Sequence, residues 1–252
     1  METSPNDAEG HYYLGAAYRV KGRQGAAQTE FKEAERIDPN NQLYAAVANP
    51  EGPKPEDSTV PRPDAGSISG TIYTNQFFGF SYEFPKGWTV LGTDVSRALL
   101  QMGGAMLSSG DPVLQDAQRA VIQNDYPLFM AQEGLTKGGG ISQRSIQIRA
   151  LKSSDELGMH SGKEFVEMLS ASRKLFQGAI ELAGPPEEFT AGGKKFWRGN
   201  LSAKVGNGNI TASEIAIVEK GYLLLFSFVA PDAAGRDELV DTMQSLRFIE
   251  TQ

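Results

Sequence analysis

Apolar and polar residues alternate along much of the chain after residue 70, and this pattern predicts β-strands. The alternation is clearest through four aromatic residues: Phe78, Phe80, Tyr82 and Phe84. A period of two places all four on one face of a half-buried strand. Further on, the segments 194–205, 210–218 and 222–230 are separated by glycine-containing turns and predict an antiparallel meander. The last segment is apolar on both faces, so it predicts a central strand with cover on both sides.

Apolar residues recur at helical spacing between and after these strands. They predict helices at four places: after Asp94, from Asp111-Pro112, behind the capping box Ser161–Glu164, and over Ala233–Leu246. Segments 126–130 and 145–151 predict two more strands. A mainly antiparallel sheet with helices before and after it predicts an α+β fold, arranged as an α/β/α sandwich.

The first 41 residues carry a different pattern, which predicts a hairpin of two helices. Two sets of residues each share one helical face: Leu14, Ala17 and Tyr18 in the first helix, and Ala27, Phe31 and Ala34 in the second. Gly22 breaks the chain between the two helices, and Pro39 ends the second one. A short further helix is expected over residues 42–48.

This hairpin resembles one tetratricopeptide repeat over residues 8–41. Seven residues fall at the positions of that family: Leu14, Gly15, Tyr18, Ala27, Phe31, Ala34 and Pro39. Pro5 precedes Pro39 by one repeat length, so we expect the chain to open on the end of a preceding repeat. A single hairpin cannot bury its own apolar face. We therefore expect further repeats, a second copy in a homo-oligomer, or the C-terminal domain to cover Tyr12, Tyr13, Leu14, Tyr18 and Phe31.

The resemblance to tetratricopeptide repeats implies recognition of a protein or peptide by the face of the first helix. Here that face carries Glu9, Tyr12, Ala16, Arg19 and Val20. Repeats that grip a terminal carboxylate use Asn and Lys at those positions, and this sequence lacks them. The alternative is that these five residues only pack against neighbouring helices, because one repeat offers little groove.

The next segment, residues 49–68, predicts an extended spacer. Five of the 13 prolines fall between Pro50 and Pro63, and the segment has no hydrophobic period. Such a sequence cannot bury enough apolar surface to offset its ordering entropy. The sequence thus divides into a helical unit (1–48), a proline-rich linker (49–68) and a C-terminal domain (69–252).

The C-terminal domain resembles the PsbP-like family. The likeness rests on the segment Phe78–Trp88, which reads FGFSYEFPKGW, on the meander, and on the final helix before Phe248. The family's relatives include a Ran-GTPase-binding protein and bacterial envelope proteins. The resemblance therefore implies an α/β/α binding module rather than an enzyme, and a location in the bacterial cell envelope or periplasm.

Charge and composition exclude several other functions. With 24 basic and 31 acidic side chains the net charge is −7, which argues against a nucleic-acid partner. The sequence has no cysteine, so disulfides, thiolate metal sites and cysteine nucleophiles are excluded. No stretch approaches the roughly 20 apolar residues of a membrane span. No motif predicts a cofactor or a metal ion.

Two places remain as candidate sites in the C-terminal domain. Trp197, in a basic-aromatic cluster, is a candidate contact for an acidic partner or a polysaccharide. The alternative is a strand with Phe196 inside and Lys195 and Trp197 on the other face. His160, with Asp155 or Glu156, is the candidate centre of a hydrolase or ligand-processing site; the alternative is a structural or solvent-facing histidine. The hypothesis that the sequence favours is a non-catalytic adaptor that binds a protein or peptide.

Overall fold

The structure is a computed structural model of the chain. It describes residues 7–20, 23–39, 44, 48, 62–98, 125–134, 144–153, 160–171, 180–205 and 208–249. The predicted linker up to residue 61 and the helix predicted from Asp111-Pro112 lie outside the described residues. Tyr44 and Ala48, in the segment where a short third helix is predicted, are both helical.

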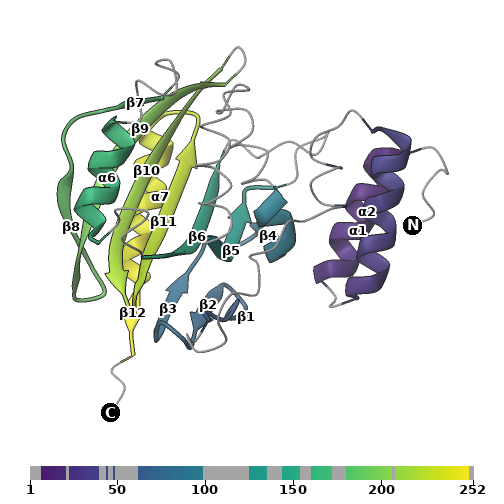
Figure 1. Cartoon of the computed structure of the whole chain (residues 1–252), viewed down its shortest axis with the longest axis horizontal. Coiled ribbons are helices and arrows are strands. Elements are labelled where there is room, and N and C mark those ends of the chain that lie inside the picture. Colours follow the sequence, from purple (N-terminus) through teal and green to yellow (C-terminus); the bar gives the residue numbers. More distant parts are fainter. Residues whose placement is uncertain are drawn as a thin grey trace.

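The N-terminal part forms two helices, α1 (Ala8–Val20) and α2 (Gln24–Ile37), which lie side by side (Figure 1). We call them the helix pair. His11 and Glu30 join them across the pair, with 2.6 Å between Nδ1 and Oε2. Phe31 is fully buried, and its ring lies 6.0 Å from that of Tyr12. The spacing of apolar residues therefore placed both helices correctly.

The C-terminal part is built on an eight-stranded sheet in the order β4-β5-β6-β11-β10-β9-β7, with β8 also paired to β9. Its strands are β4 (Thr89–Val90), β5 (Asp125–Gln132), β6 (Ser145–Lys152), β7 (Ile180–Leu182), β8 (Glu187–Ala191), β9 (Lys194–Val205), β10 (Gly208–Glu219) and β11 (Tyr222–Ala230). All described strand pairs are antiparallel. The meander β9-β10-β11 is confirmed, and β11 is central, as its apolar sequence predicts.

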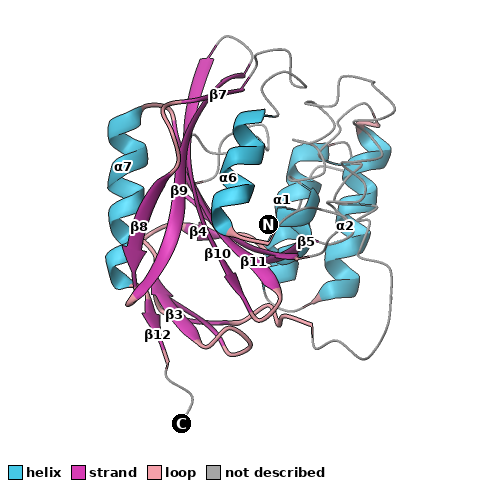
Figure 2. Cartoon of the chain, turned by 60° about the vertical axis from the view of Figure 1, so that its left-hand side comes forward, coloured by secondary structure: helices cyan, strands magenta, loops and turns pink. Residues whose placement is uncertain are grey.

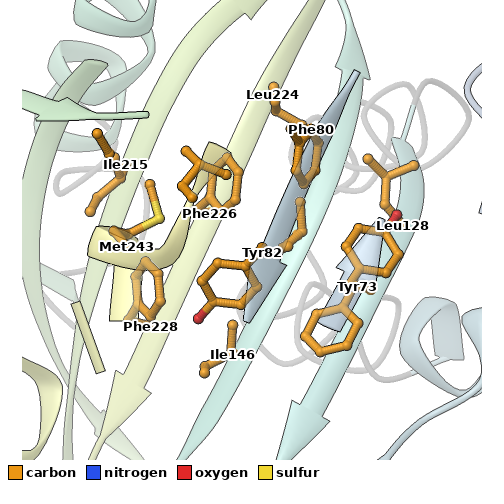
Figure 3. Close-up of a cluster of buried hydrophobic side chains, with 14 of the residues drawn as sticks. Tyr73, Phe80, Tyr82, Leu128, Ile146, Ile215, Leu224, Phe226, Phe228 and Met243 are labelled. Carbon is orange, nitrogen blue, oxygen red and sulfur yellow. The ribbon is translucent and has the colours of Figure 1, made fainter. Parts of the chain in front are cut away.

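A second, four-stranded sheet packs on one face of the large sheet. It has the order β1-β2-β3-β12, from strands β1 (Ser67–Ser69), β2 (Ile72–Asn75), β3 (Phe80–Glu83) and β12 (Arg247–Phe248). Helix α7 (Ala233–Asp241) covers the same face and continues as the 3₁₀ turn η3 (Thr242–Ser245). Figure 3 shows the aromatic core between these layers, in which Tyr82 and Phe226 point toward one another. The alternating aromatics of the sequence are therefore core residues, as predicted.

Helices cover the opposite face of the large sheet as well. Helix α6 (Gly162–Ala171) packs there through Phe165 and Val166 against Leu223 and Leu225 of β11. Figure 2 shows α7 on one side of the sheet, and α6, α1 and α2 on the other. The α+β class and the helices on both faces agree with the prediction.

The helix pair shares a buried cluster with the C-terminal domain. Tyr12 and Phe31 belong to it, together with four residues of the domain: Leu91, Val95, Ala98 and Met130. Val95 and Ala98 lie on a short helix over residues 93–98, which begins one residue before Asp94. Of the three covers that the sequence leaves open, the C-terminal domain is thus the one present in this structure.

Glycines allow the close approach of helix α6 to the sheet. A Cβ atom on Gly199 of β9 would lie 2.3 Å from Cγ1 of Val166. A Cβ atom on Gly162, the first residue of α6, would lie 2.3 Å from the carbonyl oxygen of Ala216. Neither distance is possible between real atoms, so only glycine permits this packing at these two positions.

Two helical glycines of the helix pair give a matched test of its packing. A Cβ atom on Gly15 would lie 2.7 Å from the Phe31 ring, whereas one on Gly25 would meet nothing within 4 Å. Gly15→Ala should therefore lower the free energy of unfolding of the helix pair by about 1–2 kcal/mol, since overpacking outweighs the gain in helix propensity. Gly25→Ala should be neutral or stabilising. Amide hydrogen exchange in α1 measures both, and equal effects would contradict the close packing.

Candidate functional site

A cluster of charged and polar side chains lies on the sheet face toward α6 and the helix pair. We call it the ionic cluster, and it consists of Arg97, Asp125, Arg149, Glu214 and Ser227. Arg149 Nη1 donates to Asp125 Oδ2 at 2.8 Å. Ser227 Oγ donates to Glu214 Oε2 at 2.6 Å. Four strands and the short helix over residues 93–98 contribute to it.

Strand alternation puts these side chains on one face. Ile148 and Ala150 point into the aromatic core, so Arg149 between them points the other way. Glu214 likewise precedes the core residue Ile215, and Ser227 stands between Phe226 and Phe228. Asp125 is the cross-strand partner of Leu151, which packs under α6.

Burial sets the electrostatics of the cluster. The Asp125 side chain is 6% exposed and that of Arg149 17%. Burial raises the pKa of the Asp125 carboxyl, against the opposing charge of Arg149. Burial also raises the pKa of Glu214, which Arg149 and the hydroxyl of Ser227 only partly offset. Charges held in such surroundings destabilise a fold unless they are well paired, so perturbed groups of this kind are candidates for function.

The pairing within the cluster is incomplete. Asp125 Oδ1, Arg149 Nε and Arg97 Nε are all shielded from solvent and lack a hydrogen-bond partner among the described residues. One acceptor and two charged donors therefore remain open in one buried cluster. Leaving such groups unpaired costs about 1–3 kcal/mol each.

The arginine on the opposite face is fully engaged by comparison. Arg198 Nε donates to Ser213 Oγ at 2.9 Å, and its Nη2 donates to Asp237 Oδ1 at 2.7 Å. Burial raises the pKa of Asp237, but hydrogen bonds from Arg236 and Arg198 outweigh it and leave that pKa lowered. This group fixes helix α7 on the sheet and is structural.

Of the five residues predicted on the face of the first helix, the structure describes the side chain of one, Tyr12. Tyr12 is only 5% exposed, and its ring packs against Phe31 and Tyr44 at centroid distances of 6.0 and 5.6 Å. It is a core residue and is not presented to a partner in this structure, because the cluster shared with the sheet covers its ring. The side chains of Glu9, Ala16, Arg19 and Val20, which also lie on α1, are outside the described set.

Trp197 lies on the same side of the sheet as the helix pair. Phe196 is fully buried in the aromatic core, so Trp197 points to the other face, as the second interpretation of this strand predicts. Its half-buried ring packs beside α6, and Lys163 Nζ lies 5.3 Å from the ring centroid. Trp197 is thus both a packing residue and a partly open surface.

His160 stands at the start of α6 and is exposed. Its backbone N–H donates to Glu164 Oε2 at 2.9 Å, and Ser161 Oγ accepts from the backbone N–H of Glu164 at 3.1 Å. These two bonds form the predicted helix cap. Asp155 and Glu156, the carboxylates of the hydrolase hypothesis, lie outside the described residues.

The ionic cluster was missed by sequence reasoning for a physical reason. In β6 the residues Ser145, Gln147 and Arg149 form the polar half of an alternating strand, which is the usual signal of a solvent-facing side. Here Ser145 is fully buried and the Arg149 side chain is 17% exposed, so this polar half is largely buried. The signal that could have found the cluster is the charge of Glu214 and Arg149 inside strands next to a fully apolar one.

Comparisons with known proteins bear on the fold only. No protein-family model matches the sequence, and no curated protein matches it. The structure is similar to the solution structure of cyanobacterial PsbP (CyanoP) from Synechocystis sp. PCC 6803, with a TM-score of 0.42 and 11% identity over 73% of this chain and 98% of that chain. A likeness at this level carries no functional argument.

Two further features are absent from the described residues. Within them, no three His, Cys, Asp or Glu side chains are grouped so as to hold a metal ion. No helix among them is long and apolar enough to cross a membrane.

The raised pKa of Glu214 predicts the pH dependence of stability. The folded chain holds this proton more tightly than the unfolded chain does, so the free energy of unfolding should fall as pH rises from about 4.3 through the folded pKa. Glu214→Gln should flatten this slope and stabilise the chain at neutral pH. Urea unfolding at a series of pH values measures the slope, with the exposed Glu188→Gln as control. An unchanged slope in Glu214→Gln would contradict the assignment.

Removing one partner of the buried ion pair should be strongly destabilising. Arg149→Met leaves the Asp125 carboxylate buried without its cation, which costs about 3–5 kcal/mol. The double variant Arg149→Met with Asp125→Leu should regain most of that loss, because both charges are gone. Arg36→Met, which breaks the exposed pair with Glu33, is the matched control and should change little. Denaturant unfolding of these three variants and of the unmodified chain measures the effects, and equal effects of Arg149→Met and Arg36→Met would contradict the burial.

Proposed function

We propose that this chain is a non-catalytic adaptor that binds a protein or peptide. In this proposal the helix pair is a tetratricopeptide repeat, and residues 69–252 form a PsbP-like domain. The observation that carries the proposal is the position of α1 and α6 on the same side of the large sheet (Figure 2). A single partner can therefore reach the first helix and the surface around Trp197 together.

The shared buried cluster supports a fixed presentation of that side. Tyr12 and Phe31 pack in one cluster with Val95 and Met130 of the domain, so the helix pair has apolar contacts that hold it against the sheet. A platform held in this way loses little conformational freedom on binding, which favours affinity. Tyr12 acts in this attachment, and recognition falls to the other predicted residues of α1.

The surface at α6 offers side chains suited to a partner. Met168 is 39% exposed. Lys163 Nζ lies over the Trp197 ring, 5.3 Å from its centroid. A half-buried tryptophan beside a cation, with an exposed methionine on the same helix, is a composition found at protein interfaces. The partner can be another protein or a second copy of this chain, and light scattering at two concentrations separates these cases.

Site-specific crosslinking tests the adaptor proposal. A photoreactive amino acid is placed at Arg19 on α1 or at Met168 on α6 in the full chain, and at Asp241 on the opposite face as control. We expect positions 19 and 168 to capture the same polypeptide in cells that make the protein, and position 241 to capture none of it. Arg19→Glu and Lys163→Glu should each reduce capture several-fold, as should deletion of residues 1–48.

Other results would argue against the adaptor. Capture of unrelated polypeptides from positions 19 and 168 would separate the two surfaces. Capture that survives deletion of residues 1–48 unchanged would remove the helix pair from recognition. Turnover of a substrate that is lost on His160→Ala would favour the hydrolase hypothesis instead.

A further inference from the structure

We propose that the ionic cluster is a binding site for a free α-amino acid, whose ammonium and carboxylate groups take the hydrogen bonds that the cluster leaves open. The inference does not depend on the adaptor function. It rests on which atoms of the cluster are paired, which are not, and what chemistry would complete them.

The open atoms are each shielded from solvent and belong to charged side chains. Asp125 uses Oδ2 to accept from Arg149, whereas no donor from the described part of the chain reaches its Oδ1, although the side chain is only 6% exposed. Arg149 donates that hydrogen bond through Nη1, and its Nε has no hydrogen-bond partner among the described residues. Arg97 Nε is likewise buried and open, and the charge of Arg97 lowers the pKa of the same Asp125 carboxyl. The three open atoms therefore belong to one electrostatic unit.

Glu214, the other acid of the cluster, does not form hydrogen bonds with these unpaired atoms. Glu214 accepts from Ser227 and acts on Arg149 through its charge, without a hydrogen bond to the guanidinium. The cluster as a whole holds two arginines and two carboxylates, so its formal charge is balanced. A ligand that brings no net charge into this buried place meets the smallest desolvation penalty.

The open atoms specify both ends of the ligand. Oδ1 of Asp125 can accept a hydrogen bond, and an ammonium group is a strong donor for it. The Nε–H of an arginine, with the neighbouring Nη–H, forms a fork that matches a carboxylate. A lone anion would leave Asp125 unsatisfied, and a lone cation would leave both arginines unsatisfied. An α-amino acid carries both groups on one carbon and is neutral overall.

Neighbouring side chains indicate the preferred side chain of the ligand. Leu225 is the cross-strand partner of Arg149, and Leu151 is the partner of Asp125. Both leucines are buried in the cluster under α6. Apolar side chains therefore border one side of the charged groups, and we expect small aliphatic amino acids to bind better than acidic or basic ones.

Calorimetric titration of the full chain tests the proposal. The probes are L-alanine and L-valine, with L-glutamate and L-lysine for specificity, and sodium acetate and methylammonium chloride as single-charge controls. We expect L-alanine or L-valine to bind and to raise the melting temperature with concentration. The two single-charge controls should bind at least about tenfold more weakly, since each leaves part of the cluster unpaired.

Variants locate the site. Asp125→Asn and Arg97→Gln should each weaken L-alanine binding by about tenfold or more, and two variants are used so that one folding failure does not end the test. Arg198→Gln, on the opposite face, should leave binding unchanged. The inference is overturned if no amino acid binds at about 10 mM, which would mean that ordered water completes the cluster. Binding of acetate as tight as that of L-alanine, or binding unaffected by Asp125→Asn and Arg97→Gln, would overturn it as well.

Discussion

The two-sided burial of strand β11 is the constraint on which the rest of the structure depends. Leu224, Phe226 and Phe228 face the aromatic core, while Leu223 and Leu225 face the cluster under α6. A strand of this kind is stable only with apolar cover on both faces. The small sheet and α7 supply one cover, and α6 supplies the other (Figures 1 and 2). The helix pair lies on the α6 side of the sheet, where it shares a buried cluster with Leu91, Val95, Ala98 and Met130.

The face of the sheet toward α6 also carries charged side chains. Arg149 and Glu214 stand on strands β6 and β10, next to β11, and the alternation that puts Ile148 and Ile215 in the core puts these charges on the other face. On the α7 face the corresponding arginine, Arg198, has three hydrogen-bonding partners and a further ion pair with Glu187. On the α6 face the pairing stays incomplete. This asymmetry separates a structural ion pair from a candidate site.

The sequence was a good guide where one period decides the structure. The alternation Phe78–Phe84, the apolar run of β11 and the helical spacing around Phe31 all predicted elements that the structure has. It was a poor guide where the outcome depends on what lies across space. Nothing local to Tyr12 tells whether it faces a partner or its own domain, and nothing local to Arg149 tells that the polar half of β6 is covered. The helix over residues 93–98, which carries both Val95 of the shared cluster and Arg97 of the ionic cluster, links these two outcomes.

The central claim is that the helix pair is held on the sheet face that carries α6. The absence of cysteine from the sequence makes a direct distance measurement simple, since two introduced cysteines are the only labelling sites. Spin labels at Lys32 on α2 and Glu167 on α6, both exposed positions, report the separation of the two elements by electron double resonance. The account predicts one narrow distance distribution that matches the structure and does not change with salt. A broad distribution, as expected for two bodies joined only by a flexible tether, would contradict it.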